Sequence, residues 1–190
     1  MNIEISVKKI LMIIGVLVVC SIAGSLKDSR DGKTYKTVQI GNQVWMAENL
    51  NYQTSESFCY DNKEGNCKKY GRLYTWDDAK KACPAGWRLP SVVDFKTLLA
   101  AMGTSGEERS QNLRAGTWNN GSDTFGFSAL PAGNYYSSNK KFSNVGYSTY
   151  FWTSTEDNSY DAYSLDVYDD SANVTYDGKY GGNSVRCLQD

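Results

Sequence analysis

The chain has 190 residues, enough for one domain with a sizeable core. Charged residues make up 22 % of it and the formal net charge is −1, which argues against the basic face of a nucleic-acid-binding protein. It contains no histidine, so His-based metal sites, Ser-His triads and histidine general bases are excluded.

The first 23 residues have the pattern of an export signal. Lys8 and Lys9 precede the apolar run Ile10–Val19, and Ser21-Ile22-Ala23 then supplies a small-x-small cleavage site. The apolar run is shorter than the roughly 20 residues that a transmembrane helix needs, which favours cleavage over an uncleaved anchor. We therefore expect an exported protein, secreted, periplasmic or on the outer-membrane surface, that contacts a membrane only through this segment.

The five cysteines allow a second interpretation of the same segment. Cys20 could be a lipid attachment site that ends a lipoprotein signal, although Val19 is larger than the residue usual before such a cysteine. With Cys20 removed or lipidated an even number remains, which in an exported chain indicates two disulfides with three possible connectivities. The four are Cys59, Cys67, Cys83 and Cys187. Cys59 and Cys67 enclose only a short polar loop, so their pairing is the simplest assignment.

Residues 24–33 are polar, and we expect them to form a short linker before one domain at 34–190. From Thr34 to Met46 apolar residues alternate with polar ones on both sides of Gly41-Asn42. Two β-rich runs around such a pair predict a hairpin, whose apolar side chains would begin the core.

Two helices follow, and each has a clear start and stop. The first runs from its N-cap Thr75 to the helix-breaking Pro84. The second runs from its N-cap Ser91 to a C-terminal Gly103 and buries one apolar stripe. Residues 104–109 are expected to form a loop.

Beyond that loop, strand-sized apolar pieces are separated by Gly, Ser, Asn and Asp. The pieces are Phe125–Leu130, Tyr150–Trp152, Tyr163–Val167, Val174–Tyr176 and Ser184–Leu188. Phe151 and Trp152 are expected in the core. Together these elements predict an α+β fold with two short helices, an antiparallel β-sheet and long loops.

Several segments, in the same order and with the same spacing, resemble a known bacterial family. They are IGNQVWMAENLNY, YGRLYTWDDAKKACPAGWRLPS, YFWTSTE and NSVRCLQD, and the resemblance covers about residues 28–189. These segments are similar to the Fibrobacter succinogenes major paralogous domain, a poorly characterised family of exported or surface-associated proteins. Trp76, Ala79 and Cys83, with the terminal stretch Ser184–Cys187, also resemble the first helix and last strand of C-type lectin-like domains.

The resemblance implies a C-type-lectin-like fold in which Cys83 pairs with Cys187 and encloses the second half of the chain. The Glu-Pro-Asn or Gln-Pro-Asp and Trp-Asn-Asp motifs of sugar-binding C-type lectins are absent, so calcium-dependent sugar binding is not carried over. Formylglycine-generating and related sulfatase-modifying domains are distantly similar around Arg88-Leu89-Pro90. Their oxidation needs a cysteine pair near the C-terminus, where this chain has only Cys187.

The candidate ligand-binding residues are tyrosines and acids in the C-terminal loops. Tyrosine beside Ser, Asn, Gly and Asp is typical of recognition surfaces, because rigid rings stack on a ligand and small polar groups hydrogen-bond to it. The residues are Tyr160, Tyr163, Tyr168, Asp169, Asp170, Tyr176 and Tyr180. We expect a binding module for polysaccharide or a partner protein, with no catalytic residue, no metal site and no cofactor. For Tyr168 and Tyr176, exposure and burial are equally expected.

Three alternatives stay open. Asp169 and Asp170 with Asp166 or Asp177 supply carboxylates of the kind that Ca²⁺ binds, but EF-hand spacing is absent and a solvated, turn-rich loop is favoured. An accessory or degenerate enzyme acting on plant cell-wall glycans is the second, although no motif selects one carboxylate pair for hydrolysis. The third is a structural component of the cell envelope.

Overall fold

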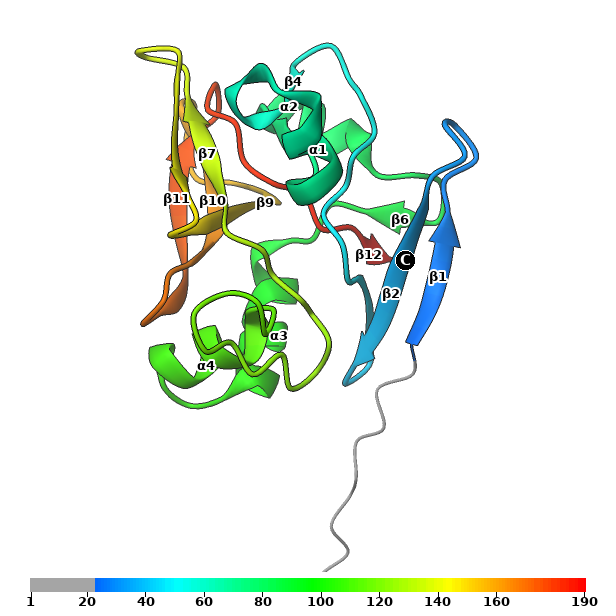
Figure 1. Ribbon diagram of the computed structural model, residues 1–190, viewed down its shortest axis with the longest axis vertical. Helices are drawn as coiled ribbons and strands as arrows, with labels where there is room; N and C mark the ends of the chain where they lie inside the picture. The colour runs from blue at the N-terminus through cyan, green and yellow to red at the C-terminus, as the bar shows by residue number, and fades with distance from the viewer. Residues whose placement is uncertain (1–22) are drawn as a thin grey trace, which may run out of the picture.

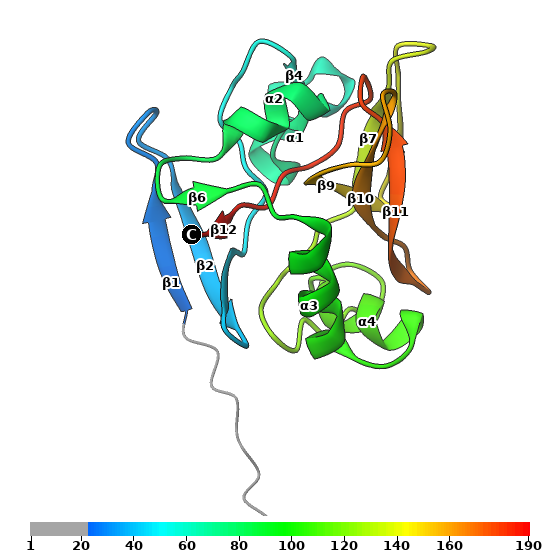
Figure 2. The same ribbon diagram turned by 180° about the vertical axis from the view of Figure 1, so that it is seen from behind.

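The computed structural model describes residues 23–190, so the predicted export signal and Cys20 lie outside the described residues. Two five-stranded sheets stand on opposite sides of the molecule, and the helices lie between them (Figures 1 and 2). No helix in this part of the chain is long and apolar enough to cross a membrane. The predicted α+β class is confirmed.

The first sheet is antiparallel throughout. In spatial order it contains β1 (Ala23–Lys27), β2 (Thr34–Ile40), β3 (Gln43–Met46), β12 (Leu188–Gln189) and β6 (Trp87–Arg88). The second contains β11 (Ala172–Gly178), β10 (Asp161–Val167), β9 (Thr149–Glu156), β7 (Ala132–Tyr136) and β8 (Lys141–Val145). β7 and β9 run parallel, so this sheet is mixed and not purely antiparallel as predicted. A short separate pair is formed by β4 (Ser57–Phe58) and β5 (Leu73–Tyr74).

The helices are a 3₁₀ turn, η1 (Tyr60–Asn62), and α1 (Glu64–Tyr70), α2 (Trp76–Ala82), α3 (Val92–Met102) and α4 (Gly106–Leu113). α2 and α3 are the two that the sequence predicts. A capping box begins α3: the Ser91 hydroxyl accepts from the Asp94 backbone N–H, and the Asp94 carboxylate accepts from the Ser91 N–H at 2.7 Å. Thr75 precedes α2 as predicted, but its side chain makes no capping hydrogen bond.

The other two helices are not predicted from the sequence. α1 begins inside the polar loop between Cys59 and Cys67, where only Cys67 faces inward and no apolar periodicity reveals it. α4 overlaps the loop expected at 104–109. A local signal exists there, because the Ser105 hydroxyl caps the helix by accepting from the Glu108 N–H at 3.1 Å.

Residues 24–33, expected to be a linker, instead form strand β1 and a tight turn. β1 pairs with β2 along its whole length. The turn is held by the buried Asp28, whose carboxylate accepts from the Arg30 backbone at 3.0 Å and from its guanidinium at 2.6 Å. A strand at the edge of a sheet is held by backbone hydrogen bonds to one neighbour and can keep polar side chains in solvent. The polar sequence of β1 therefore does not show the alternation of apolar residues by which a strand is predicted.

Most of the remaining strand predictions are confirmed. β2 and β3 form the hairpin expected around Gly41-Asn42, and three of the C-terminal apolar pieces lie in β9, β10 and β11. Only the last residue of the piece Ser184–Leu188 belongs to a strand, β12. The β7–β8 hairpin is not predicted, because polar residues occupy many of its positions.

The predicted strand at Phe125–Leu130 is wrong. The Asp123 carboxylate accepts from the Ser128 backbone at 2.7 Å, which folds the segment into a turn. Gly126 has a φ of +75°, a left-handed conformation that breaks a strand and that side chains disfavour. The apolar residues here face the core from a loop.

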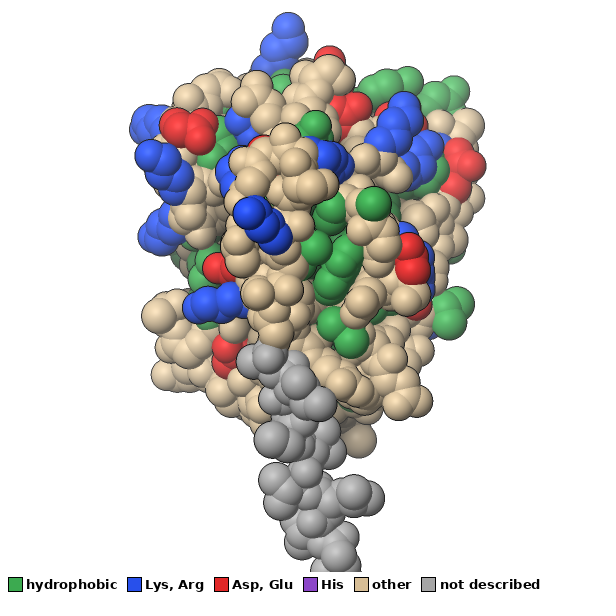
Figure 3. All heavy atoms as spheres, turned by 90° about the vertical axis from the view of Figure 1, so that its right-hand side faces the viewer, with side chains coloured by type: hydrophobic (Ala, Val, Ile, Leu, Met, Phe, Trp, Pro, Cys, Tyr) green, Lys and Arg blue, Asp and Glu red, His purple; other side chains and the backbone are tan. Residues whose placement is uncertain are grey.

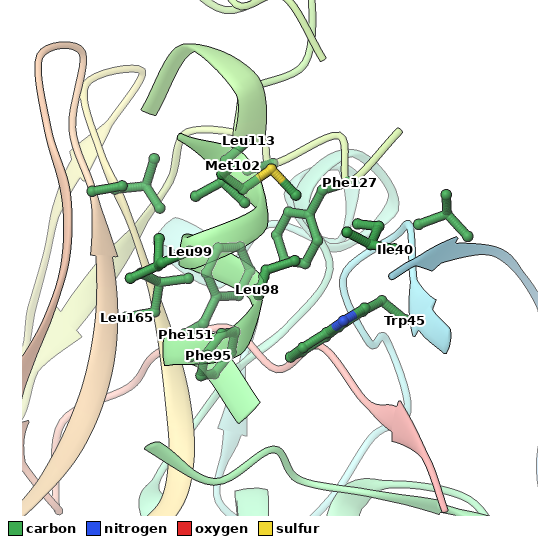
Figure 4. Packing of buried hydrophobic residues seen from close by; sticks show 14 of the residues in the cluster. Ile40, Trp45, Phe95, Leu98, Leu99, Met102, Leu113, Phe127, Phe151 and Leu165 are labelled. Atoms are coloured by element: carbon green, nitrogen blue, oxygen red, sulfur yellow. The ribbon is translucent and has the colours of Figure 1, made fainter. Parts of the chain in front are cut away.

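The larger core cluster packs around α3, between the two sheets. Trp45 of the first sheet, Phe127 of a loop and Phe151 of the second sheet converge there (Figure 4). The Phe127 ring centroid lies 5.8 Å from each of the other two, in edge-on contacts. A second cluster surrounds α2 and includes Trp152. Phe151 and Trp152 are both fully buried, as predicted.

Both predicted disulfides are present. Cys59–Cys67 joins residues separated by 8 positions, and Cys83–Cys187 joins residues separated by 104. The second bridge ties the end of α2 to the residue before β12, so it closes the whole second half of the domain into one loop.

Replacing both members of a pair with alanine should destabilise the domain according to loop length. In the chain-entropy model the long bridge contributes about 4.7 kcal/mol and the short one about 2.5 kcal/mol. Urea unfolding of the Cys83→Ala/Cys187→Ala and Cys59→Ala/Cys67→Ala variants measures both losses. An equal or larger loss for the short bridge would contradict the assignment of Cys83–Cys187 as the main covalent constraint.

Candidate functional site

The tyrosines and acids predicted to bind a ligand do not form one site. They lie on the β10–β11 hairpin, but at its two opposite ends. One end has Tyr163 directly opposite Tyr176, with Tyr160 and Tyr180 just outside the strands. The turn at the other end has Tyr168, Asp169 and Asp170. The sequence leaves exposure and burial of Tyr168 and Tyr176 equally expected, and in the structure both are exposed, Tyr176 at 61 % and Tyr168 at 40 %.

The two acids at the turn bond to nearby residues. The Asp169 carboxylate accepts from Asn119 at 2.7 Å and lies 3.6 Å from the buried Arg114 guanidinium, so it anchors the loop before β7. The Asp170 carboxylate accepts from the Ser171 hydroxyl. Among the described residues, no group of three carboxylates is close enough together to hold a metal ion, so the calcium alternative gains no support from the structure.

The tightest cluster of potential metal ligands in residues 23–190 is Cys59, Glu64 and Cys67. Its two cysteines are joined in a disulfide, so they offer no thiolate to an ion. The cluster is therefore part of the scaffold.

A buried acid stands on the face of β10 that points away from α3. Leu165 and Val167 face the α3 core, so strand alternation places Ser164 and Asp166 on the opposite face. Asp166 is only 9 % exposed, and its carboxylate accepts from the Ser164 hydroxyl at 2.7 Å. Burial raises the pKa of Asp166 to about 7.

Hydrogen bonds extend from this acid over the same face. The Tyr168 hydroxyl lies 3.5 Å from the Asp166 carboxylate, and its ring meets Tyr150 edge-on at 6.0 Å. Asp177 accepts from Asn183 at 3.1 Å, and burial raises its pKa too. Of the predicted ligand-binding residues, Tyr168 alone hydrogen-bonds through its side chain to one of these two buried acids.

A concavity of the described residues lies elsewhere, beside the first sheet. It is a groove of about 680 Å³ between β2, the segment 47–51, the C-terminal half of α1 and the loop 124–130. Figure 3, which views the molecule from the side of β1, shows apolar side chains near the centre of that side, with Lys and Arg side chains on its flanks. A volume of this size is within the range of sites that hold small ligands or short polymer segments.

The groove combines apolar and polar side chains. Val38, Ala47, Phe125 and Leu130 supply apolar surface, and Tyr35 and Tyr70 supply rings. Its charged lining residues are Lys33, Lys36, Lys68, Lys69 and Glu48. Apolar surface with a few placed polar groups is the usual composition of a binding site.

Three walls of the groove are held together by one buried guanidinium. Arg186, which is 0 % exposed, donates to the Met46 carbonyl at 3.1 Å, to the Ser128 carbonyl at 2.9 Å and also to the Phe127 carbonyl. It also donates to the Asn49 side-chain oxygen at 2.6 Å. Asn49 in turn donates to the Tyr70 carbonyl at 2.8 Å, which attaches α1.

Arg186 has no carboxylate partner among the described residues; carbonyl oxygens and two aromatic rings surround it instead. Its guanidinium carbon lies 4.7 Å from the Phe127 ring centroid and 5.5 Å from that of Phe151. Burial lowers the pKa of Arg186 to about 9, so the group stays charged at neutral pH. A charge placed this deep must keep all its acceptors, which fixes the groove walls relative to each other.

The groove residues are not found by the sequence reasoning. Apart from Gly24 they come from four segments between residues 33 and 130, none of which contains a local ligand-binding pattern. Arg186 does have a signal, because a charged residue sits between apolar Val185 and Cys187 in a segment expected to be buried. A charge in that position predicts a buried hydrogen-bonding centre.

Fold, disulfides and groove together define a class: a small, disulfide-linked α+β domain with an open groove beside one sheet. The model of the Fibrobacter succinogenes major domain family matches residues 38–189. The chain therefore belongs to this family, which confirms the resemblance seen in its sequence. Neither the curated proteins nor the solved structures contain a significant match to it.

Asp166 should make the stability of the domain depend on pH. Its folded-state pKa of about 7 exceeds the unfolded value of about 3.9, so the folded state holds the proton more tightly. The free energy of unfolding should then fall between about pH 4 and pH 7, by at most about 4 kcal/mol. Asp166→Asn should remove most of this fall, whereas the exposed Asp170→Asn should not change it. Urea unfolding at several pH values measures this, and a wild-type stability that rises over this range would show that Asp166 is not protonated as inferred.

Proposed function

We propose that this domain is an exported or cell-surface binding module that holds polysaccharide or a partner protein in the groove beside the first sheet. The groove is the single observation on which the proposal rests. It offers apolar surface for contact area and polar groups for orientation, and its walls are fixed in advance by Arg186. A preformed site loses little conformational entropy on binding.

Two hydrogen-bonding side chains of the groove are available to a ligand. Thr34 is exposed and Asn51 is half-buried, and their side chains make no hydrogen bond to another described residue. The rings of Tyr70 and Phe125 stand at its surface, both half-buried. Such rings pack against sugar faces and against apolar side chains alike.

Export is supported by the two disulfides, since such bonds persist in oxidising compartments. A C-type-lectin-like arrangement is supported by the Cys83–Cys187 bridge, which links a helix in the first half of the domain to its C-terminal end. The signal peptide and the lipidation of Cys20 remain proposals that rest on the sequence alone. No catalytic step is included, because Asp166, the acid with the most raised pKa, is absent from the groove lining.

Tyr70→Ala should abolish or strongly weaken ligand retention and leave the fold intact. The hydrogen bond at Tyr70 uses its backbone carbonyl, so removing the ring keeps the contact with Asn49. Tyr147→Ala is the matched control, because Tyr147 is 75 % exposed and lies outside the groove. A glycan array and a pull-down with the mature protein, with and without chelator, give the ligand, and thermal melting of each variant checks the fold.

Tyr176→Ala distinguishes binding in the groove from binding at the hairpin tyrosines, which the sequence alone predicts as the site. Retention should survive this change, because Tyr176 does not line the groove. Loss of binding in Tyr176→Ala, with binding kept in Tyr70→Ala, would place the site on the β10–β11 hairpin and contradict the proposal.

A further inference from the structure

We propose that the ligand of the groove is an anionic glycan, a chain of sugar residues that bear carboxylates. This inference rests on the proposed function and names the ligand class of the same site. It follows from three observations: the positive charge of the lining, the absence of acidic partners for most of its lysines, and the neutral side chains that also line the groove.

The lining is basic although the chain is not. Lysines supply four of its charged side chains and a single glutamate supplies the fifth, whereas the whole chain has a formal net charge of −1. Positive charge is therefore gathered at this groove. A concave surface of one sign concentrates ligands of the opposite sign and speeds their association.

Three of the four lysines are not neutralised by the described part of the protein. Lys33 pairs with Asp31 at 2.8 Å, but Lys36, Lys68 and Lys69 make no ion pair with any residue in 23–190. The Glu48 carboxylate is engaged by the backbone N–H of Lys36 at 2.6 Å. None of the three ammonium groups is neutralised by a carboxylate there, so all three can attract an anionic ligand, although that of Lys69 also lies 4.7 Å from the Tyr70 ring centroid.

The type of cation favours carboxylates spaced along a flexible polymer. No arginine lines the groove, and arginine is the residue whose planar fork binds phosphate and sulfate with two parallel hydrogen bonds. Lysine is a mobile point charge on a long stem. It can follow single carboxylates that recur along a chain without a fixed orientation.

The neutral lining favours a glycan over an acidic peptide. Thr34 and Asn51 present a free hydroxyl and a free amide, which match a ligand with many hydroxyls. The half-buried rings of Tyr70 and Phe125 offer flat surface for sugar rings. An acidic peptide supplies carboxylates but few hydroxyls to use these groups.

The test compares three polymers on the mature protein: polygalacturonate, its carboxyl-reduced neutral form and polyglutamate. Polygalacturonate should bind at least tenfold more tightly than either of the others. Raising the salt from 0.1 M to 1 M shortens the Debye length from about 10 Å to about 3 Å and should weaken this binding at least tenfold. Calorimetry or affinity electrophoresis measures each case.

The variant Lys36→Gln/Lys68→Gln/Lys69→Gln should weaken polygalacturonate binding at least tenfold. Lys81→Gln/Lys96→Gln/Lys140→Gln removes the same charge from exposed positions outside the groove and should change it less than twofold. All six lysines are exposed, and circular dichroism melting verifies that both variants fold.

Failure of this inference is distinguishable from failure of the proposed function. The neutral polymer could bind as tightly as polygalacturonate, independently of salt, and lose binding in Tyr70→Ala. That result would overturn the inference of an anionic ligand and keep the groove as the site. Tighter binding of polyglutamate would replace the glycan with an acidic protein partner. Binding of polygalacturonate that neither Tyr70→Ala nor the groove lysine variant weakens would overturn both.

Discussion

The buried guanidinium of Arg186 is the interaction on which the arrangement of this domain depends. It sits beside Cys187, so the long disulfide positions its backbone while its side chain bonds to the end of β3, to the segment after it and to the loop before β7. Through Asn49 the network reaches the end of α1. Removing an acceptor would leave a charge unsatisfied in the core, which costs more than an ordinary hydrogen bond. Two loops and the end of one helix are fixed in this way.

Scaffold and recognition surface are therefore linked but distinct. The α3 core and the two disulfides account for folding, while the groove is lined by both apolar and polar residues drawn from segments far apart in the chain. Gly71 lies in the groove lining directly against Asn49, which Arg186 holds. Its φ is +76°, and a Cβ there would lie 2.6 Å from that of Asn49. Any larger residue would push α1 away from the network and widen the groove.

The fold is predictable where local chemistry decides it. The capping box at Ser91 and the hairpin around Gly41-Asn42 are such cases. Prediction fails where the local structure is decided by strand pairing or by side-chain hydrogen bonds between residues. The polar strand β1 forms because it pairs with β2, and the hydrogen bond from Ser128 to Asp123 folds the apolar segment 125–130 into a turn. The polar neighbours of the hairpin tyrosines leave exposure and burial equally expected for Tyr168 and Tyr176, and the separation of these residues to opposite ends of the hairpin depends on strand register. The groove has no local signal, because only tertiary packing brings its lysines together.

The central claim is that the segments joined by Arg186 form the surface that holds the ligand. Amide chemical shifts of the ¹⁵N-labelled mature domain, recorded while an oligomer of galacturonate is added, test it directly. The account predicts saturable shifts that appear together in residues 33–38, 47–51, 67–71 and 124–130. Shifts confined to residues 160–180, with the groove amides unchanged, would contradict it.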